Sequence, residues 1–298
     1  MPVPVSVVIP HRNSGRLLER CVAALAAARE VDEVVVADEH SMDGSIERAA
    51  LVGDVRIVQS PAPGFAAAMN AGIAAARGEM LLLLNSDAFV RPDTVERLRT
   101  RLDEEPLLAL CGAALVDESG ERSKTHSHLL TLRRSLLDAL GFRPPLRQEG
   151  SGLERAEAVF PTCALARREA LEQVGGFDER FPFYYEDMDL CRRFTAAGWQ
   201  LAIDWDAEAV HLGGGSTSQH APQRWFQQFH RSRLLYLQKH YPRGWRLYSV
   251  LWALKALVHM LAWIARAGGR RLRADAPGAV LAQQWASAFR HSALPSRS

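Results

Sequence analysis

The sequence predicts an α/β fold with a mainly parallel sheet and flanking helices, followed by a C-terminal helical extension. Short apolar runs in the first 117 residues show almost no polar alternation, which is typical of strands buried on both faces. Helical patterns separate these runs, and strands that alternate with helices form right-handed crossover units with parallel strands. The chain has 298 residues, 48% of them hydrophobic, and can therefore bury a large core.

Each predicted strand is followed by a predicted helix or by a loop. Strands are expected over residues 5–10, 31–38, 54–60, 79–87 and 107–117. Helices are expected to begin near Gly15, Asp43, Gly64 and Arg91. Ser14 and Ser41 precede two of them and are of a residue type that caps helix N-termini.

The cysteines indicate the compartment. Cys21, Cys111, Cys163 and Cys191 are far apart and form no CxxC pair. Because a free thiol in apolar surroundings behaves as a small hydrophobic group, we expect reduced cysteines and a cytoplasmic protein. The stretch MPVPVSVVIP lacks a basic region and a long apolar run, so no signal peptide is expected there.

Charge is spread unevenly along a chain whose net charge is only +2. Residues 219–298 contain 13 lysines and arginines and a single acid, Asp275, so residues 1–218 carry an excess of acids. We therefore expect two regions, residues 1–218 and a basic extension over residues 219–298. The aromatic residues of the extension favour an anionic membrane surface over nucleic acid as its partner.

Polar residues cluster where three of the predicted strands end. In a parallel sheet, ligands bind outside the carboxyl ends of the strands, so these residues mark a candidate nucleotide site. They are His11, Arg12 and Asn13, then Asp38 and Glu39, then Asn85, Ser86 and Asp87.

No GxGxxG motif follows the first strand, and no GxxxxGK[ST] motif occurs in the chain. Dinucleotide and P-loop sites thereby lose their main support. A metal ion is the remaining way to hold a diphosphate, and Asp87 could supply the carboxylate that Mg²⁺ needs. The alternative, that Asp87 only caps the turn before Arg91, stays open from the spacing alone.

Five blocks of the chain occur in the order and spacing of a known family. They are VSVVIPHRN, VVVADEHSMDGS, PGFAAAMNAGIAAARGEMLLLLNSDAFVRPD, GGFDERFPFYYEDMDLCRRFTAAGW and HLGGGS. Across roughly residues 5–218, the chain resembles glycosyltransferase family 2, and most closely its rhamnosyltransferase-like bacterial branch. The agreement of five separate blocks makes this resemblance specific.

The resemblance implies a GT-A fold and an inverting, metal-assisted transfer of a sugar from a nucleoside diphosphate. It assigns Asp38 to the nucleotide base, Asp87 to the metal and the diphosphate, and His211 to the metal. The alternatives are that Asp38 only bounds a turn and that His211 is a structural residue. The implied cofactor is Mg²⁺ or Mn²⁺, and a histidine ligand shifts the preference toward Mn²⁺. The other residues expected to bind the nucleotide sugar are Pro10, Arg12, Asn13, Asn85 and Ser86.

The chain departs from the family pattern at two of these positions. Asn85 stands where a first Asp often occurs, which leaves Asp87 with most of the charge on the metal. Glu39 stands where Asn is common, so the contacts to the base or ribose are open. Asp43, Gly64 and Asn70 are expected to serve helix entry and packing rather than chemistry.

The segment YYEDMDLCRR contains the second group of acids. An inverting transfer needs a carboxylate that takes the proton of the acceptor hydroxyl. By the resemblance, Asp187 is this base, and Glu186 helps to position it or the acceptor. The alternative is that Asp187 and Asp189 only stabilise the start of a helix, with local pairing to Arg192 and Arg193.

Two segments lie outside the family blocks. Residues 118–157 are expected to form a loop on the acceptor side.

Residues 247–265 are long enough to cross a bilayer, but Lys255 near their centre disfavours spanning. We expect instead an amphipathic helix at the inner face of the cell membrane whose aromatic and cationic stripe meets the lipid headgroups. The alternative is packing on the first domain or on a second copy, giving a homodimer. The stripe comprises Tyr248, Trp252, Lys255, His259, Trp263 and Arg266.

The leading functional hypothesis is an inverting glycosyltransferase of polysaccharide or lipid-linked glycan synthesis, with a donor such as dTDP-rhamnose. A sugar-phosphate nucleotidyltransferase is a second hypothesis, but PHRNSGRLL is a poor version of its glycine-rich loop. A catalytically silent, membrane-associated scaffold of the same fold is a third. Such a scaffold would be expected to lack Asp87 or Asp187, and both are present.

Overall fold

The computed structural model describes residues 4–142, 144–181, 183–213 and 222–266. The chain divides into two units. The first comprises residues 1–129, 146–182 and 186–218, and the second comprises residues 130–145, 183–185 and 219–298. The second unit therefore combines the C-terminal extension with two short segments from the preceding sequence.

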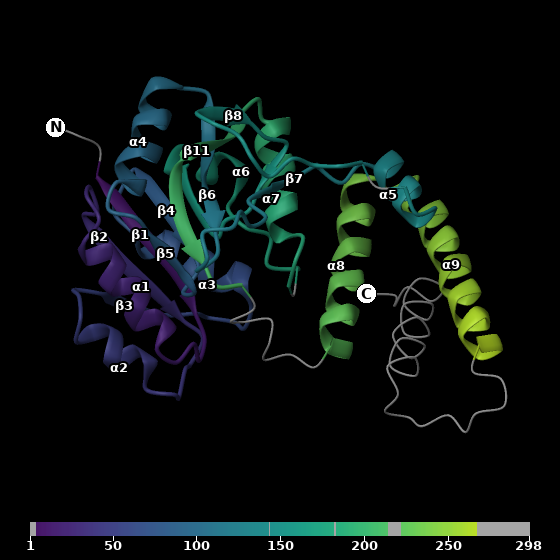
Figure 1. The fold of residues 1–298 in the computed structure, drawn as a ribbon, viewed down its shortest axis with the longest axis horizontal. Helices are drawn as coiled ribbons and strands as arrows, with labels where there is room; N and C mark the ends of the chain where they lie inside the picture. Colours follow the sequence, from purple (N-terminus) through teal and green to yellow (C-terminus); the bar gives the residue numbers. More distant parts are fainter. Residues whose placement is uncertain (1–3, 143, 182, 214–221, 267–298) are drawn as a thin grey trace. The chain divides into compact units, whose positions relative to one another are not determined.

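The first unit is built around a nine-stranded sheet (Figure 1). Eight strands run in the order β3-β2-β1-β4-β10-β6-β11-β5, and β8 pairs with β11. Strands β3, β2, β1 and β4 run parallel to one another, and β6 runs parallel to β11. β10 lies antiparallel between β4 and β6, and β5 and β8 are antiparallel to β11. The strands are β1 (Val5–His11), β2 (Glu33–Asp38), β3 (Arg56–Gln59), β4 (Met80–Leu84), β5 (Ala88–Val90), β6 (Leu108–Val116), β8 (Leu153–Arg155), β10 (Cys163–Arg167) and β11 (Gln200–His211).

Helices cover both faces of this sheet. One face packs on α1 (Leu17–Ala26), α2 (Ser45–Ala50) and α4 (Thr94–Glu104). The other packs on α3 (Phe65–Ala75), α6 (Arg168–Val174) and α7 (Glu186–Ala196). Successive residues of a strand serve opposite faces. Ile9 accordingly packs with the first group of helices and Val8 with the second. The predicted α/β fold with a mainly parallel sheet is confirmed.

The five strands and four helices predicted for the first 117 residues are present, with shifted ends. The predicted caps are wrong. The residues that precede α1 and α2 are Arg16 and Gly44, and neither makes a side-chain capping bond. Ser14 Oγ instead lies 3.1 Å from His11 Nδ1 at the end of β1, and Ser41 Oγ accepts the N–H of Asn13 in the loop after β1.

The segment 118–157, predicted as a loop, contains regular structure. It includes β7 (His126–Ser127), which pairs with β9 (Ala158–Val159), and also α5 (Leu132–Ala139) and β8. Gln148 accepts the N–H of Thr125 at 2.9 Å and donates to the carbonyl of His126 at 3.1 Å. These bonds fix the part of the segment that belongs to the first unit.

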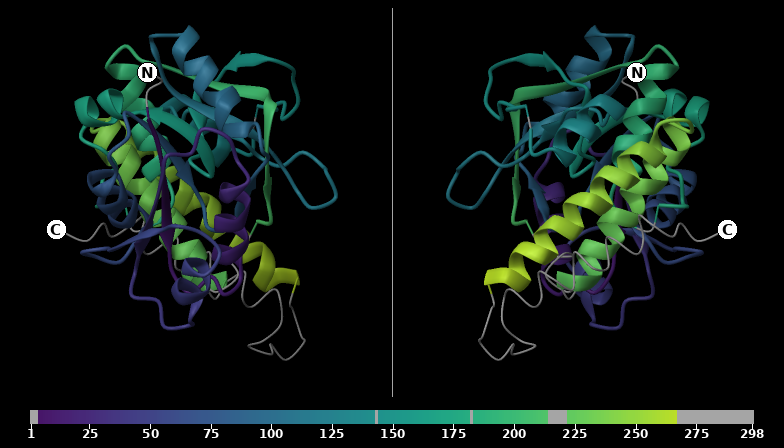
Figure 2. Two further views of the ribbon diagram at one scale, coloured as in Figure 1. Left: turned by 90° about the vertical axis from the view of Figure 1, so that its left-hand side faces the viewer. Right: turned by 90° about the vertical axis from the view of Figure 1, so that its right-hand side faces the viewer.

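The described part of the second unit contains α5, α8 (Pro222–His240) and α9 (Trp245–Arg266). The two long helices lie side by side (Figures 1 and 2). Arg233 of α8 pairs with Asp138 of α5 at 2.6 Å, and its guanidinium lies 5.0 Å from the ring centroid of Tyr248. Lys255 Nζ donates to the carbonyl oxygen of Asp138 at 3.0 Å.

The described part of the predicted aromatic stripe faces inward rather than outward. Tyr248 and Trp252 are 1% and 5% exposed, because they pack on His230 and Arg233 of α8. The side chains of His259, Trp263 and Arg266, and the arginines at 270, 271 and 273, lie outside the described residues. No helix among the described residues is long and apolar enough to cross a membrane.

Candidate active site

The turn that follows β4 carries Asn85, Ser86 and Asp87. The N–H of Asn85 donates to the carbonyl of Thr162 at 2.9 Å, and the N–H of Ala88 donates to the carbonyl of Asn85 at 3.0 Å. These bonds close the turn and fix it beside the start of β10. Asp87 is 5% exposed, so its carboxylate occupies a well-defined position at the strand end.

Strand β11 brings His211 to this turn. β5 pairs antiparallel with β11 and places Ala88 opposite His211. The N–H of Leu212 also donates to the carbonyl of Asp87 at 3.2 Å. His211 Nε2 consequently lies 3.4 Å from Asp87 Oδ1. The structure thus brings together the two residues that the sequence assigned to the metal, although 124 positions separate them in the chain.

Asp87 and His211 together offer a carboxylate oxygen and an imidazole nitrogen. Among the described residues there is no group of three or more His, Cys, Asp or Glu side chains that could hold a metal ion. A divalent cation here would need further ligands from a diphosphate or from water. This fits Mg²⁺, which proteins commonly bind through one or two carboxylates and substrate phosphates, and the nitrogen donor is also suited to Mn²⁺.

The loops after β1 and β2 are bound to each other at the same edge of the sheet. Asn13, whose φ is 45°, donates its N–H to Ser41 Oγ at 2.9 Å and accepts the N–H of Met42 at 2.9 Å. The N–H of Gly15 donates to Asp43 Oδ2 at 2.7 Å. Asp43 therefore joins the two loops, in keeping with the structural role expected for it.

Asp38 closes β2 and is only 3% exposed. Its carboxylate accepts the N–H of Ser41 at 3.1 Å and an N–H of Gln59 at 3.4 Å. A carboxylate has about four acceptor positions, so these bonds leave capacity for a ligand. Pro10 is buried at the end of β1, whereas Arg12 is exposed beyond it.

Glu39, the second departure from the family pattern, has protein partners. Its Oε2 accepts the N–H of Gly64 at 2.8 Å and lies 3.8 Å from a guanidinium nitrogen of Arg12. Gly64 adopts φ 117° and ψ 149°, a conformation that essentially only glycine tolerates. Glu39 therefore holds the entry of α3 against the β2 loop.

His11 is a site residue that sequence reasoning named among the strand ends but did not assign. It is 1% exposed, and its Nε2 lies 2.7 Å from Ser45 Oγ. Burial lowers the pKa of His11 and outweighs the negative charges of Asp38 and Asp43, which act to raise it. The imidazole is therefore neutral at neutral pH. It links the loop after β1 to the start of α2.

The second acidic group lies at the start of α7. Two consecutive residues with positive φ, Tyr184 at 66° and Tyr185 at 69°, lead into Glu186 and Asp187. Glu186 is 7% exposed, and Asp187 Oδ1 accepts the N–H of Met188 at 2.7 Å. Left-handed backbone is uncommon outside glycine and clusters at functional sites.

Burial changes the acidity of this pair. It raises the pKa of Asp187 to about 6. Burial, together with the charge of Asp187, also raises the pKa of Glu186 well above its usual value. An aspartate with a pKa of about 6 is mostly ionised at neutral pH, and its charge favours the protonated form of Glu186. A base with a pKa near the working pH is well suited to proton transfer.

Asp189, two residues further on, has a structural role. It is fully buried and accepts from Arg193 Nε at 2.7 Å, as the local pairing predicted from the sequence requires. Arg193 also donates to the carbonyl of Val174 at the end of α6. Leu190 and Phe194, four residues apart, are buried on the inward face of α7.

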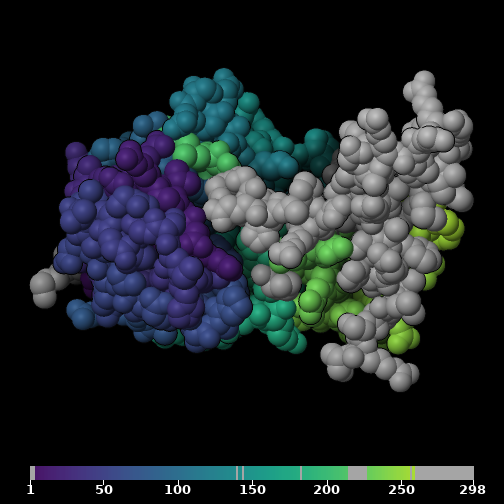
Figure 3. Space-filling model, turned by 90° about the horizontal axis from the view of Figure 1, so that it is seen from below, coloured from purple at the N-terminus to yellow at the C-terminus, as the bar shows by residue number. Residues whose placement is uncertain are grey.

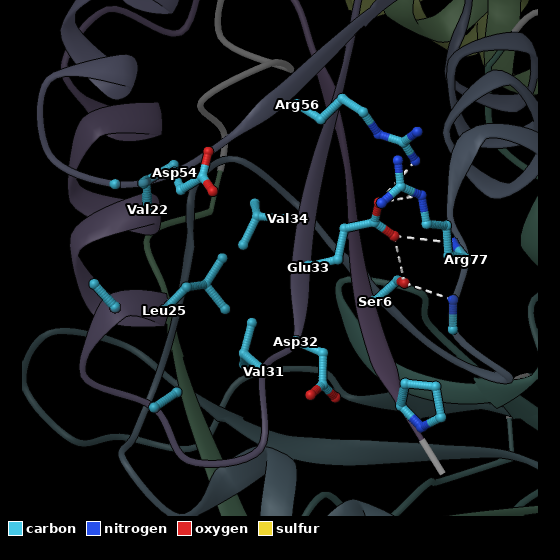
Figure 4. A pocket seen from close by; sticks show the side chains of 15 residues that line it. Ser6, Val22, Leu25, Val31, Asp32, Glu33, Val34, Asp54, Arg56 and Arg77 are labelled. Atoms are coloured by element: carbon cyan, nitrogen blue, oxygen red, sulfur yellow. Dashed lines mark hydrogen bonds and ion pairs between the residues drawn. The ribbon is translucent and has the colours of Figure 1, made fainter.

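A cavity of about 660 Å³ lies at the opposite ends of the strands (Figure 4). It is lined by Ser6 and Glu33 near the starts of β1 and β2, whereas His11 and Asp38 end these strands. The pKa of Glu33 lies below its usual value. Burial acts to raise this pKa, but hydrogen bonds from Ser6 and Arg77 and the charges of Arg56 and Arg77 outweigh that effect. Glu33 is thus satisfied within the protein, and this cavity is not the candidate active site.

Comparison with known proteins decides the family. The profile described as Glycosyl transferase family 2 matches residues 6–175. An N-acetylglucosaminyl-diphospho-decaprenol L-rhamnosyltransferase of Mycobacterium tuberculosis is 30% identical over 276 residues, covering 84% of this chain and 88% of that protein. The chain belongs to glycosyl transferase family 2.

Other family 2 relatives are similar over a smaller share of their length. The succinoglycan biosynthesis protein ExoO of Rhizobium meliloti is 38% identical over 224 residues, covering 72% of this chain and 62% of that protein. These names agree with the expected place of this family 2 glycosyltransferase in polysaccharide or cell-envelope synthesis.

Solved structures confirm the GT-A fold of this family 2 chain. A mannosyltransferase from Pyrobaculum calidifontis, in complex with GDP-Man and Mn²⁺, superimposes with a TM-score of 0.61 at 16% identity, covering all of this chain and 89% of that one. A glucosyl-3-phosphoglycerate synthase from Mycobacterium tuberculosis, with Mn²⁺ and UDP, gives a TM-score of 0.55 at 20% identity, covering 79% of each chain. At such identities the likeness shows the fold alone.

In this family 2 fold, the N-terminal strands and helices that carry the donor-side loops form a continuous surface, coloured purple to blue in Figure 3. Gly213, after His211, has φ 66°. The glycines at 214 and 215 lie outside the described residues.

Proposed function

We propose that this family 2 glycosyltransferase is an inverting enzyme that transfers rhamnose or another hexose from a nucleoside diphosphate to a polysaccharide or lipid-linked glycan. The observation that carries the proposal is the likeness to the decaprenol-linked rhamnosyltransferase over more than four fifths of both chains. The pairing of Asp87 with His211 and the raised pKa of Asp187 to about 6 support the chemistry.

In this proposal, the donor binds across the carboxyl ends of β1, β2 and β4. Asp38 accepts from the base, and Pro10, Arg12 and Asn13 line the nucleoside side. Asn85, Ser86 and Asp87 face the diphosphate. A divalent cation, Mg²⁺ or Mn²⁺, held by Asp87 and His211, would neutralise the charge that develops on the leaving diphosphate.

On the acceptor side, Asp187 takes the proton of the attacking hydroxyl. The hydroxyl oxygen then bonds to the anomeric carbon on the face opposite the diphosphate, and the bond to the diphosphate breaks with inversion. The charge of Asp187 favours the protonated form of Glu186, and in that form Glu186 would donate a hydrogen bond to an acceptor oxygen or to Asp187. The two carboxyl groups thus have different roles, because burial raises the pKa of both and the charge of Asp187 raises that of Glu186 further.

We also propose that the enzyme acts in the cytoplasm, as a peripheral protein at the inner face of the cell membrane. All four cysteines are free and buried, in keeping with a reducing compartment. The basic extension supplies attraction to anionic lipid. A lipid-linked acceptor would be presented at that surface, as the name of the mycobacterial relative indicates for that protein.

A donor-hydrolysis screen tests the reaction class. UDP, dTDP and GDP sugars are incubated with the protein in the presence of Mg²⁺, Mn²⁺ or EDTA. We expect release of one nucleoside diphosphate, dTDP from dTDP-rhamnose in the favoured case, only with a divalent cation. Formation of a nucleotide sugar from a sugar phosphate and a nucleoside triphosphate would instead support a nucleotidyltransferase. Absence of turnover with every donor would support a silent scaffold.

A further inference from the structure

One face of α9 is aliphatic and exposed. Leu247, Val250, Leu254 and Val258 are 54%, 56%, 53% and 62% exposed. Their spacing of three, four and four residues places them along one side of the helix. Figure 3 shows atoms of this segment, coloured yellow, at the surface of the molecule.

The opposite face of α9 carries aromatic and polar groups and is buried. Tyr248, Ser249 and Trp252 are 5% exposed or less, and Lys255 donates to the carbonyl of Asp138. A helix on the surface of a protein in water normally buries its apolar side and exposes its polar side. The polarity of this part of α9 is reversed, which is expected for a helix whose outer side meets an apolar medium.

The charges of the two long helices favour a lipid surface as that medium. Residues 222–266 contain eight lysines and arginines and no aspartate or glutamate. A second copy would bring the same positive charge against this one, which opposes association at this face. Anionic lipid headgroups attract such a segment. Leu140 and Phe142, which follow α5 in the same unit, are also exposed, at 62% and 66%.

We propose that the face formed by Leu247, Val250, Leu254 and Val258 inserts into the surface of a bilayer that contains anionic lipid, with α9 lying along the membrane. The described helix is not apolar enough to cross the bilayer, so it lies on it. The proposal rests on the proposed function in one respect: a lipid-linked acceptor would explain why the enzyme docks at a membrane surface. It assigns the lipid contact to the face opposite the aromatic stripe.

Vesicle binding of the full chain tests this face. The double variant Val250→Gln/Leu254→Gln is compared with Leu51→Gln/Leu107→Gln, which changes two exposed aliphatic residues of the first unit. We expect wild type and the control to float with phosphatidylcholine vesicles that contain phosphatidylglycerol. The α9 variant should bind about tenfold more weakly or worse, because apolar insertion is lost. Unfolding temperatures check that both variants fold.

A fluorescent label locates the contact directly. The four native cysteines are buried, so Val250→Cys supplies one reactive thiol. We expect rapid labelling in solution and a blue shift of an environment-sensitive dye when anionic vesicles are added, with no shift for a label at Leu51→Cys. Neither measurement needs donor or acceptor, so its outcome is independent of the proposed reaction.

Three results would overturn the proposal. The first is equal vesicle binding by wild type and the α9 variant. The second is slow labelling of Cys at position 250 in solution, which would show that another part of the chain or a second copy covers the face. The third is a wild-type dimer that the α9 variant converts to a monomer with no change in vesicle binding.

Discussion

His211 Nε2 lies 3.4 Å from Asp87 Oδ1, so the end of β11 and the turn after β4 present an imidazole and a carboxylate at one point. This pairing depends on the antiparallel contact between β5 and β11, which sets Ala88 opposite His211. Metal binding, if the proposed function holds, should therefore depend on both residues.

Asp87→Ala should abolish divalent-dependent sugar transfer while the protein stays folded. The leaving diphosphate would lose charge neutralisation worth several kcal/mol in the transition state. His211→Ala should retain some activity but require more Mn²⁺ for half-maximal rate. The measurement is initial rate against Mn²⁺ concentration. His128→Ala is a matched control, since His128 also faces a carboxylate, that of Glu157, at 3.1 Å. Full wild-type activity in excess EDTA would contradict this role of the pair.

Asp187→Asn should lower turnover by about 10² to 10⁴, the usual contribution of a positioned general base, with little change in donor binding. It should also raise the unfolding temperature at neutral pH, because it removes a partly buried charge whose pKa the fold raises to about 6. Asp189→Asn is the comparison: it breaks a buried pair with Arg193 and should cost about 3 kcal/mol of stability. The roles of the two acids at the start of α7 would be reversed if Glu186→Gln were inactive and Asp187→Asn nearly silent.

The rate should fall on the acid side as Asp187 takes up a proton. With a pKa of about 6, kcat should halve near that pH and decline below it. The measurement is kcat against pH in the presence of saturating donor, acceptor and metal. An acid limb near pH 4 would show that Asp187 titrates as an ordinary aspartate and is not buried during turnover.

The same pKa shift makes a stability prediction with a definite sign. The pKa of Asp187 is raised from 3.8 in its usual state to about 6 in the folded protein, so the folded state holds the proton more tightly than the unfolded state. Its contribution to stability is therefore full at about pH 4 and is lost as the pH rises to about 6. The free energy of unfolding of Asp187→Asn, measured in urea at several pH values, should lack this decline. An identical pH dependence in wild type and variant would refute the shift.

Asn70 connects α3 to the chain before α7 and should matter for stability. Its side chain donates to the carbonyl of Phe177 and accepts the N–H of the same residue, both at 2.9 Å, and donates to Glu179 at 2.8 Å. Asn70→Ala would leave these backbone groups without their partner, at a cost of about 1 to 3 kcal/mol. Urea unfolding measures the loss. A change below about 0.5 kcal/mol would show that water replaces the amide.

The local pattern of the sequence was sufficient for the strands and helices of the first 117 residues. Continuous apolar runs such as 80–84 can be stable only when buried on both faces, and this requires the helices found between them. The position of β10 could not be predicted in this way. Its residues Cys163–Arg167 lie antiparallel between β4 and β6, a pairing set by chain segments remote in sequence.

The residues of the candidate site were named from the sequence, but their partners were not. His211 and Asp87 were assigned to one metal through the resemblance, and the structure places them together. The raised pKa of Asp187 to about 6 depends on burial that no local pattern reveals. The expectation that the aromatic stripe of α9 faces outward is wrong for Tyr248 and Trp252, because aromatic side chains that suit lipid headgroups also pack well against Arg233 and His230.

The anomeric configuration of the product tests the central claim most directly. Full-length protein is incubated with the nucleotide sugar that the donor screen selects, Mn²⁺ and a polyprenyl-diphosphate-linked N-acetylglucosamine acceptor, and the new linkage is assigned by NMR. We predict one new glycosidic bond whose configuration is opposite to that of the donor, formed by wild type and not by Asp187→Asn. A product that retains the donor configuration, or undiminished product from Asp187→Asn, would contradict an inverting transfer with Asp187 as its base.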